Sequence, residues 1–439
     1  MSNEKVQPAR PFAAFVCLDW ADEKHAWALC QPDAEGIEQG ELENTPEAIQ
    51  RWAAGLAQRF PGQAVAVAVE SNRKVLFGLL KYGHLVLFPI HPATLAWYRA
   101  AWCPSGAKDD PSDTLLGLEL LRHHRDRLQV WQRDTVETRT LQFLVEDRRG
   151  LVDDTTKYSN RLTDRLKLYF PQILEWFDDV TTPMVGDLLR RWPTLEQLQK
   201  ASPRTLRQFF HQHHSRSNQL IEKRLQQIRR AVPATSDPAV LATSVTYVRS
   251  LLEIIATIRN AIAEIERHIA QAFDQHPDAP LFRSLPGAGP ALEPRLLVAL
   301  GSQRERFASA HQLHCYSGIA PVLQRSGKSQ LVRFRRGCNS FLRQTFHEWA
   351  ACTIRCSPWA RGYYQHLRAK GKGHQAAVRA LAYKWIRILF RCWKDRTPYE
   401  EARYLQSLRR RQAPKPDLRA FRWDQTAGLH RFAGLGVSS

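Results

Sequence analysis

Two short apolar runs, each closed by a carboxylate, constrain the fold of this 439-residue chain more than any other feature. The run Ala13–Leu18 is followed by Asp19, and the run Ala64–Val69 is followed by Glu70. Continuous apolar runs of this length are typical of strands that are covered on both faces, as in sheets with helices on both sides. The sequence therefore predicts buried strands that end in Asp19 and Glu70.

A second pair of carboxylates precedes a helical pattern. Asp110 and Asp113 lie in the segment Lys108-Asp109-Asp110-Pro111-Ser112-Asp113, and leucines at helical spacing follow it. Residues three apart in the first turn of a helix lie on one face, so both side chains are expected to point the same way. Each carboxylate alone could be a turn or helix-capping residue. Their order of strand, strand and helix favours a common role.

Four carboxylates at such positions suit one kind of chemistry. Phosphoryl transfer builds up negative charge, which one or two divalent ions can neutralise while they align the attacking and leaving oxygens. Mg²⁺ prefers hard oxygen ligands, and Mn²⁺ can replace it. Asp19, Glu70, Asp110 and Asp113 are therefore candidate catalytic residues and Mg²⁺ ligands in an enzyme that acts on nucleic-acid strands.

Residues 12 to about 135 alternate strand and helix signals. Strands are expected up to Leu18, at His25–Cys30, around Gly36–Leu42, up to Glu70 and at Leu85–Ile90, with helices at Pro46–Gln58, at Lys74–Tyr82 and from Asp113. This is an α/β order, with an early meander followed by parallel crossovers. It is the order that a ribonuclease-H-like sheet requires.

The middle of the chain is predicted to be helical. From Thr135 to about Asp274 the strand signals vanish, and apolar residues recur at helical spacing. The most regular stretch steps by three and four through Val248, Leu251, Ile255, Ile258, Ile262, Ile265 and Ile269. A narrow apolar seam of this kind favours a coiled coil, whose partner helix lies either in the same chain or in a second copy. The segment is predicted to be a spacer or a dimerisation arm.

The formal net charge of +20 is concentrated at the C-terminal end of the chain. Residues 281–439 hold 29 Lys and Arg against 8 Asp and Glu, so the first 280 residues are near neutral. A phosphate-binding surface is therefore expected mainly in the C-terminal third. A basic face could also serve an acidic membrane or simply solubility.

Cysteine usage and hydropathy bear on the compartment. The eight cysteines form no C-x-x-C pair, and no N-terminal segment combines basic residues with a long apolar stretch. A disulfide scaffold, a zinc ribbon and secretion are therefore disfavoured. Because no uncharged run is long enough to span a bilayer, we expect a cytoplasmic, reduced protein without a membrane partner.

The basic region contains a glycine-rich turn and a serine among cations. Gly287 and Gly289 would let the backbone approach a phosphate closely, as in helix-hairpin-helix DNA binders, or would form only an interhelical turn. Ser326 is surrounded along the chain by Arg325, Lys328, Arg333, Arg335, Arg336 and Arg343. Cations favour loss of a serine proton and stabilise its phosphorylated form, which fits a nucleophile in strand cleavage. From spacing alone, however, Ser-Gly in a basic loop is more often a turn.

Several short motifs occur in order, beginning at Lys108, Pro286, Tyr316, Ser326 and Gly337. They match the patterns Lys-x-Asp-x-x-Asp, Pro-Gly-x-Gly, Tyr-x-Gly-x-x-Pro, Ser-Gly and Gly-x-Asn-x-x-x-Arg. On these motifs the chain resembles the insertion-sequence transposases that carry an Asp-Glu-Asp-Asp tetrad plus a catalytic serine, the bridge-RNA-guided recombinases. The pilin-gene invertases are also similar to this family, and the resemblance covers most of the chain.

The resemblance implies an α/β plus α architecture with defined parts. Residues 1–135 would form a RuvC-like, ribonuclease-H-like domain, and residues 136–280 a helical linker with a coiled coil. Residues 281–408 would form a mainly helical transposase domain with the catalytic serine, and residues 409–439 a basic tail. Asp19, Glu70, Asp110 and Asp113 would bind Mg²⁺, while Ser326 would attack a DNA phosphate and form a phosphoserine intermediate.

The resemblance also implies partners. A structured guide RNA, the bridge RNA, would pair with donor and target DNA, so that base pairing supplies sequence specificity. Composite sites between subunits imply a homo-oligomer, either a dimer or a tetramer. The chain is longer than typical members of the family, which leaves the RNA architecture and the subgroup open. The predicted nucleic-acid-binding residues are Lys108, Gly287, Gly289, Arg325, Lys328, Arg333, Arg335, Arg336, Asn339 and Arg343.

Other functions stay open at the level of the sequence. The tetrad could act alone with water, as in a metal-dependent Holliday-junction resolvase-like nuclease, or the chain could be a site-specific DNA invertase without a guide RNA. It could also be a non-catalytic nucleic-acid-binding factor whose carboxylates are structural. Ser326 together with the glycine turn disfavours the resolvase, and the complete tetrad disfavours the binding factor.

Overall fold

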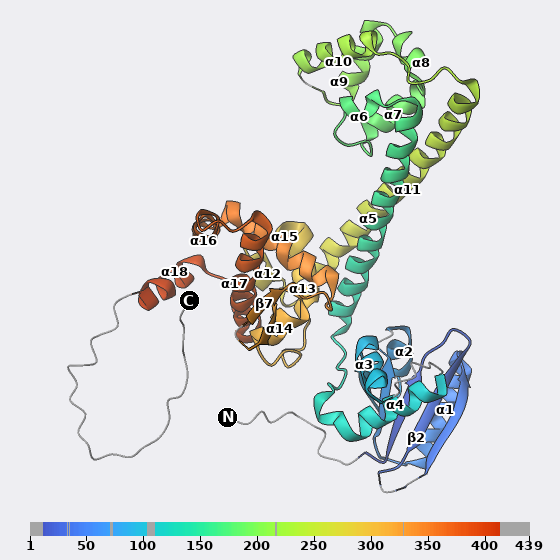
Figure 1. Ribbon diagram of the computed structural model, residues 1–439, viewed down its shortest axis with the longest axis vertical. Helices are drawn as coiled ribbons and strands as arrows, with labels where there is room; N and C mark the ends of the chain where they lie inside the picture. Colours follow the sequence, from blue (N-terminus) through green and yellow to red (C-terminus); the bar gives the residue numbers. More distant parts are fainter. Residues whose placement is uncertain are drawn as a thin grey trace, which may run out of the picture. The chain divides into compact units, whose positions relative to one another are not determined.

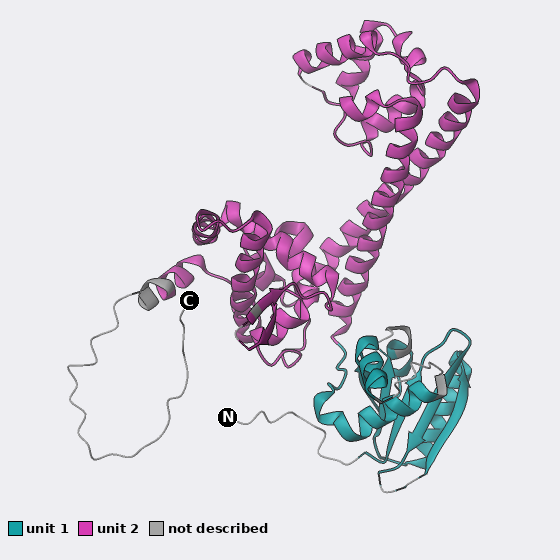
Figure 2. Cartoon of the chain, viewed as in Figure 1, with its two compact units in different colours: residues 1–133 teal, residues 134–439 magenta. Residues whose placement is uncertain are grey.

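The computed structural model describes residues 12–32, 34, 36–70, 73–102, 110–215, 217–327 and 329–412 (Figure 1). It divides the chain into two compact units, unit 1 at residues 1–133 and unit 2 at residues 134–439 (Figure 2). Each unit has its own hydrophobic core. The predicted acidic tetrad therefore falls in unit 1, and Ser326 falls in unit 2.

Unit 1 is built on a sheet whose described strands run in the order β3-β2-β1-β4-β5. β1, β2 and β3 pair antiparallel, whereas β4 pairs parallel with β1, and β5 pairs parallel with β4. The predicted meander followed by parallel crossovers is therefore confirmed. The strands are β1 (Ala14–Asp19), β2 (Lys24–Cys30), β3 (Ile37–Glu43), β4 (Val65–Glu70) and β5 (Leu85–Ile90).

Helices cover both faces of the sheet, which is why its central strands are continuously apolar. Val16 and Val67 pack with residues of α1 and α2 on one face. Phe15 and Ala68, one position along each strand, pack with residues of α3 and α4 on the other face. A strand covered on both sides has no polar face to alternate with. The helices are α1 (Pro46–Arg59), α2 (Arg73–Leu79), α3 (Pro92–Trp102), α4 (Asp110–His124) and the short η1 (Arg125–Arg127).

Two helices of unit 1 differ from the prediction. α3 was not expected, because of its described residues only Leu95 is buried, and one buried position gives no helical periodicity. α4 begins at Asp110, three residues before the predicted start at Asp113. Both predicted carboxylates of this segment therefore belong to the first turn of α4.

Unit 2 begins with a long arm, formed by α5 (Val136–Tyr169) and α11 (Pro238–Asp274), which pack along each other in opposite directions (Figure 1). Val248 and Ile255 of the predicted seam are buried with Leu166 of α5, and Ile269 is buried with Val145. Of the two partners that the sequence left open, α5 in the same chain is thus the one seen here. At the far end the arm carries α6 (Gln172–Trp176), α7 (Pro183–Arg191), α8 (Leu195–Gln199), α9 (Pro203–Gln212) and α10 (Asn218–Arg230).

The apolar character of α11 has an explanation inside the protein. By length and composition alone, this helix could cross a membrane. Its seam residues pack on α5 at both ends of the arm, and the core helix of a two-helix arm needs the same apolar stripe as a membrane span. Packing on α5 therefore accounts for the buried part of this stripe, which is 28% of its most apolar window.

The rest of unit 2 is a helical bundle with one β-hairpin. Trp349, Trp385 and Trp393 are fully buried in its core. Each indole N–H has a partner, since Trp349 donates to the Pro286 carbonyl at 3.0 Å and Trp393 to the Gly301 carbonyl at 2.8 Å, while Trp385 donates to the Thr353 hydroxyl at 2.8 Å. The mainly helical prediction holds, but the sequence did not indicate the hairpin. The elements are α12 (Ala279–Arg283), α13 (Gly289–Leu300), α14 (Ala310–Tyr316), β6 (Val322–Ser326), β7 (Ser329–Arg333), α15 (Ser340–Cys356), α16 (Pro358–Ala369), α17 (His374–Asp395) and α18 (Glu401–Gln412).

Candidate active site

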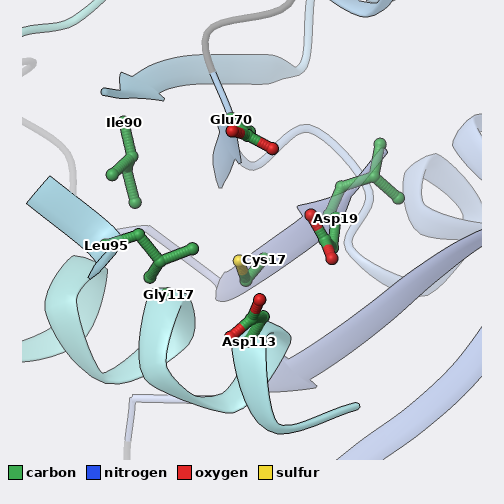
Figure 3. Close-up of a pocket in the computed structure, with 8 residues that line it drawn as sticks. Cys17, Asp19, Glu70, Ile90, Leu95, Asp113 and Gly117 are labelled. Carbon is green, nitrogen blue, oxygen red and sulfur yellow. The ribbon is translucent and has the colours of Figure 1, made fainter. Parts of the chain in front are cut away.

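Three of the four predicted carboxylates of unit 1 line one small pocket (Figure 3). Asp19 ends β1 and Glu70 ends β4, and because Leu18 pairs with Val69 in parallel register, both carboxylates leave the sheet at the same edge. Asp113 comes from the first turn of α4. The enclosed space is about 10 Å³, roughly that of one water-sized sphere. We call this site the acid pocket; its other lining residues are Cys17, Leu18, Ile90, Leu95 and Gly117.

A close contact between α4 and β1 places Asp113 over the strand. Gly117 lies one turn after Asp113, and a Cβ atom added to it would lie 2.3 Å from Cys17 Sγ. Real Cβ atoms do not approach sulfur so closely, so only glycine fits at this position. The absence of a side chain at Gly117 thus sets how near Asp113 comes to the ends of β1 and β4.

The pKa of the Cys17 thiol reflects both its burial and the negative charge of the acid pocket. Burial raises the pKa of this thiol far above its ordinary value, and the nearby carboxylates of Asp19 and Asp113 raise the pKa further. The thiol therefore stays protonated at neutral pH. A protonated, fully buried thiol is a spacer between β1 and α4, and the negative charge of the pocket belongs to its carboxylates.

Arg99 of α3 neutralises Asp113. Its Nε donates to Asp113 Oδ1 at 2.7 Å, and its Nη2 contacts the same oxygen. Asp113 is only 3% exposed, and a carboxylate this deeply buried needs a partner of opposite charge. Sequence reasoning missed Arg99, because its helix has no recognisable period and no motif links it to Asp113, fourteen residues later.

The donor chemistry of the acid pocket fits a hard divalent cation. Carboxylate oxygens from two strand ends and one helix surround a space of ionic size. Within the described part of the chain, no group of three or more His, Cys, Asp or Glu side chains stands ready to hold one ion. Asp113 is engaged by Arg99, while Lys108 and the side chain of Asp110 lie outside the described residues. Asp19, Glu70 and Asp113 are therefore the described residues that could hold a metal, once Arg99 moves.

Ser326 lies at the end of β6, in the hairpin of residues 322–333 that we call the serine hairpin. It pairs directly with Ser329 across the turn, where Gly327 has a φ of +55°. Both serines are exposed, and so are the predicted nucleic-acid-binding residues Arg325 and Arg333. Arg336 is exposed just beyond β7, whereas Lys328 lies outside the described residues. The structure thus presents Ser326 on the surface of unit 2.

Three other predicted nucleic-acid-binding residues have structural partners. Arg335 donates from Nε to the Ala320 carbonyl at 3.3 Å, and Arg343 donates from Nη1 to the Arg335 carbonyl at 3.2 Å. Asn339 caps α15, since its side-chain oxygen accepts from the backbone N–H groups of Phe341 and Leu342 at 3.0 and 3.2 Å. These contacts fix the base of the serine hairpin, and the predicted contacts of these residues with nucleic acid stay predictions.

The two glycines of the turn before α13 have different surroundings. Gly287 has a φ of +70°, and a Cβ there would come within 3.0 to 3.1 Å of the α15 backbone at Cys352 and Thr353. It is therefore a close-packing position between this turn and α15. Gly289 is exposed at the start of α13, with open space around it. Of the two predicted phosphate contacts, Gly289 is the one with room for a ligand.

Comparison with known proteins identifies the chain. Residues 16–171 match the model of IS110-type DEDD transposases, described as transposase, and residues 279–365 match that of the IS116/IS110/IS902 transposase family. The first match includes all four carboxylates, and the second includes the serine hairpin. The chain belongs to this transposase family.

Relatives extend the likeness over most of the chain. A protein named as a mini-circle transposase for IS117 in Streptomyces coelicolor is 26% identical over 89% of this chain and 96% of its own length. An uncharacterized 42 kDa protein of insertion element IS900 in Mycobacterium paratuberculosis is 26% identical over 90% of this chain and 98% of its own. An uncharacterized 43.6 kDa protein of insertion element IS110 in Streptomyces coelicolor is 28% identical over 68% of this chain and 73% of its own length. This chain is accordingly a DNA transposase of the insertion-sequence type.

Proposed function

We propose that this transposase breaks and rejoins DNA with a serine nucleophile and a RuvC-like, ribonuclease-H-like metal site. The observation that carries the proposal is the convergence of Asp19, Glu70 and Asp113 on one small pocket. The strand order β3-β2-β1-β4-β5, antiparallel then parallel, supports the ribonuclease-H-like assignment. Asp110, on the same first turn of α4 as Asp113, would complete the tetrad.

The chemistry follows from the residues of the two sites. Mg²⁺ held by the carboxylates, or Mn²⁺ in its place, would neutralise charge on the transferred phosphate. Ser326 Oγ would lose its proton and form a bond to the DNA phosphorus, while the bond from phosphorus to one DNA oxygen breaks and that oxygen gains a proton. The resulting phosphoserine ester conserves the energy of the bond. Attack on it by a DNA hydroxyl would rejoin the strand and release the serine.

Partners follow from the same proposal. The exposed cations of the serine hairpin, Arg325, Arg333 and Arg336, would bind backbone phosphates of DNA or of a guide RNA. A bridge RNA would select donor and target by base pairing, so the protein itself would read charge and shape. Because the tetrad and Ser326 belong to different units, we further propose that a homo-oligomer, dimer or tetramer, assembles composite sites. The proposed domains are a RuvC-like domain at residues 1–135, a helical linker at 136–280, a transposase domain at 281–408 and a basic tail at 409–439.

The decisive experiment traps the covalent intermediate. Protein, Mg²⁺, the RNA transcribed beside the gene and a duplex that spans the insertion junction would be mixed, and protein-linked DNA would be mapped by mass spectrometry. We expect the DNA on Ser326. Ser329→Ala is the matched control, because Ser329 is exposed and directly opposite Ser326, whereas Ser317 is fully buried and hydrogen-bonded to the His314 carbonyl.

The outcomes separate the candidate functions. Ser326→Ala should abolish both the adduct and recombination, while Ser329→Ala should retain both. DNA attached to another residue would make the nucleophile assignment wrong. Cleavage without any adduct would indicate the water-using resolvase, and adduct formation without RNA would indicate a DNA invertase that needs no guide.

A further inference from the structure

Two arginines contact one aromatic ring just beyond the serine hairpin. Phe334 follows β7 and is 41% exposed, and the guanidinium carbons of Arg343 and Arg379 each lie 4.5 Å from the centre of its ring. The two carbons are therefore no more than twice this distance apart. We call Arg343 and Arg379 the arginine pair. The ring attracts both cations through its quadrupole, but it carries no net charge and neutralises neither of them.

The positive charge of the arginine pair is not balanced by an acid. Burial lowers the pKa of the Arg379 guanidinium, and the charge of Arg343 lowers this pKa further, while no carboxylate of the described residues raises it. Arg343 donates to the Arg335 carbonyl, which is neutral, so this hydrogen bond fixes the side chain without cancelling its charge. Because a partly buried cation normally has an anion beside it, the arginine pair lacks a partner.

The helices that carry the arginine pair supply no such partner. The acid of α15 is Glu348, whose carboxylate is bound by Arg295 at 2.7 Å and by Gln344 at 2.6 Å. The acid of α17 is Asp395, about four turns after Arg379. The charge that completes the arginine pair is therefore expected from a bound anion.

The start of α17 adds to the positive potential near Arg379. Gly373 precedes this helix and has no side chain to accept from its first amide groups. Gln375 lies one turn before Arg379, and its carbonyl accepts from Nε2 of His347 on α15 at 3.5 Å. Burial lowers the pKa of His347, so the ring is neutral at pH 7 and adds no competing ion. Uncapped amides at the start of a long helix favour an anion.

We propose that the arginine pair binds a phosphate group of the DNA on which Ser326 acts, and so anchors that DNA at the base of the serine hairpin. A phosphate accepts hydrogen bonds from two guanidinium groups at once, and the planar fork of arginine matches its oxygens. The choice of DNA rests on the proposed function of Ser326, because Phe334 continues β7, whose first residue Ser329 pairs with Ser326. Ser329 and Phe334 are about 17 Å apart along an extended chain, so the anchored phosphate would lie several nucleotides from the attacked one.

The test measures DNA affinity over a series of salt concentrations. A labelled duplex that spans the insertion junction would be titrated with wild-type protein and with Arg379→Gln, and binding would be followed by fluorescence anisotropy. We expect the affinity to fall about ten-fold, because hydrogen bonds to a charged group are lost. The slope of log affinity against log salt should fall by about 1, since one phosphate contact disappears. An unchanged affinity would overturn the proposal.

Arg391→Gln is the matched control. Arg391 lies on the same helix, but its side chain is 80% exposed and already paired with Asp395 at 3.4 Å. Its loss should change DNA affinity by no more than about two-fold. An equal loss of affinity in the two variants would mean that any arginine of α17 contributes equally, and the arginine pair would then not be a site.

Two measurements separate binding from folding. Because Arg379 has no acid partner in the described chain, Arg379→Gln should not lower the melting temperature of the DNA-free protein, whereas bound duplex should raise it less than in wild type. Arg379→Lys keeps the charge but not the planar fork, so it should restore the salt slope and only part of the affinity. A lower melting temperature in Arg379→Gln, with no recovery of the slope in Arg379→Lys, would make Arg379 structural.

The guide RNA and the adduct identify what is anchored. The affinity for guide RNA alone should be equal in wild type and Arg379→Gln, and a loss confined to RNA would overturn the choice of DNA. Adduct formation by Arg379→Gln should be about ten-fold slower at limiting duplex, and the deficit should shrink as the duplex concentration rises. Weaker DNA binding in this variant, with no Ser326 adduct even in wild type, would refute the nucleophile and leave the anchor standing.

Discussion

The acid pocket of unit 1 and the serine hairpin of unit 2 each depend on a glycine, but for opposite reasons. A side chain at Gly117 would collide with Cys17, whereas Gly327 has open space around it and is needed only for its positive φ. Asp113 is 3% exposed and paired with the partly buried Arg99, while Ser326 is exposed.

The difference between the acid pocket and the serine hairpin shows which contacts fix the positions of the functional groups in each. In the acid pocket, distances between oxygens are set by the packing of α4 on β1, so changes in the core should alter metal binding. In the serine hairpin, the protein fixes the base but not the surroundings of the hydroxyl, so under the proposed function a bound nucleic acid would complete the site.

The largest effect is expected from Glu70→Gln, which removes a charge from the acid pocket but keeps the shape of the side chain. We expect adduct formation to fall on the order of 1,000-fold, because the metal supplies several kcal/mol of charge stabilisation. Calorimetric titration with Mn²⁺ should show weaker binding, while a filter-binding assay should show unchanged RNA affinity. Loss of RNA affinity in step with activity would mean that Glu70 has a structural role.

Gly117→Ala should perturb the pocket through packing alone. The new methyl group would push α4 away from β1 and misplace Asp113, and a 1 Å error in a catalytic group costs about 100-fold in rate. Adding Cys17→Ala removes the colliding sulfur and leaves the new Cβ about 3.5 Å from Cys17 Cβ, an ordinary contact. Mn²⁺ affinity and activity should therefore recover in the double variant. If they do not, the close contact does not set the geometry.

Arg99→Gln should change how strongly metal stabilises the protein. Without Arg99, Asp113 is a buried acceptor that has lost its ion-pair partner, so the metal-free protein should lose about 1–3 kcal/mol of stability. The rise in melting temperature caused by saturating Mn²⁺ should therefore be larger in the variant than in wild type. An equal rise in both proteins would show that Arg99 and the metal do not compete for Asp113.

The smallest effect is expected at Asn339, where capping and nucleic-acid contact can be separated. Asn339→Ala removes the cap of α15 and should lower the free energy of unfolding by about 1 kcal/mol. Asn339→Asp keeps the cap and should preserve stability in urea denaturation. A lower DNA affinity for the Asp variant, whose charge repels phosphate, would support the predicted contact, and an unchanged affinity would leave only the cap.

The parts of the fold that follow local rules could be predicted from the sequence. β1 and β4 are buried on both faces, so their apolar runs and terminal carboxylates stand out, and the seam of α11 has a strict helical period. The serine hairpin could not be found in this way. Its strands bury almost nothing, so apolar and polar residues do not sort by face into a recognisable alternation.

Features that depend on contacts between distant residues could not be predicted from the sequence either. Gly117 looks like an ordinary helix glycine until Cys17, a hundred residues earlier, is seen beside it. Gly287 looks like a phosphate-binding glycine until α15 packs on it. In both cases the residue type was informative, but the neighbour that gives it meaning came from tertiary packing.

The arm of α5 and α11 has a consequence for how the chain folds. At its far end Leu166 shares a buried cluster with Val248, about eighty residues later, whereas at its near end Val145 shares one with Ile269, more than 120 residues later. Closing the shorter loop costs less conformational entropy, and the helices α6 to α10 within it shorten the loop further once they form. Folding of the arm should therefore begin at its far end and proceed toward the bundle, so α13 and α15 acquire their neighbour α5 only after the opposite end of the arm has formed.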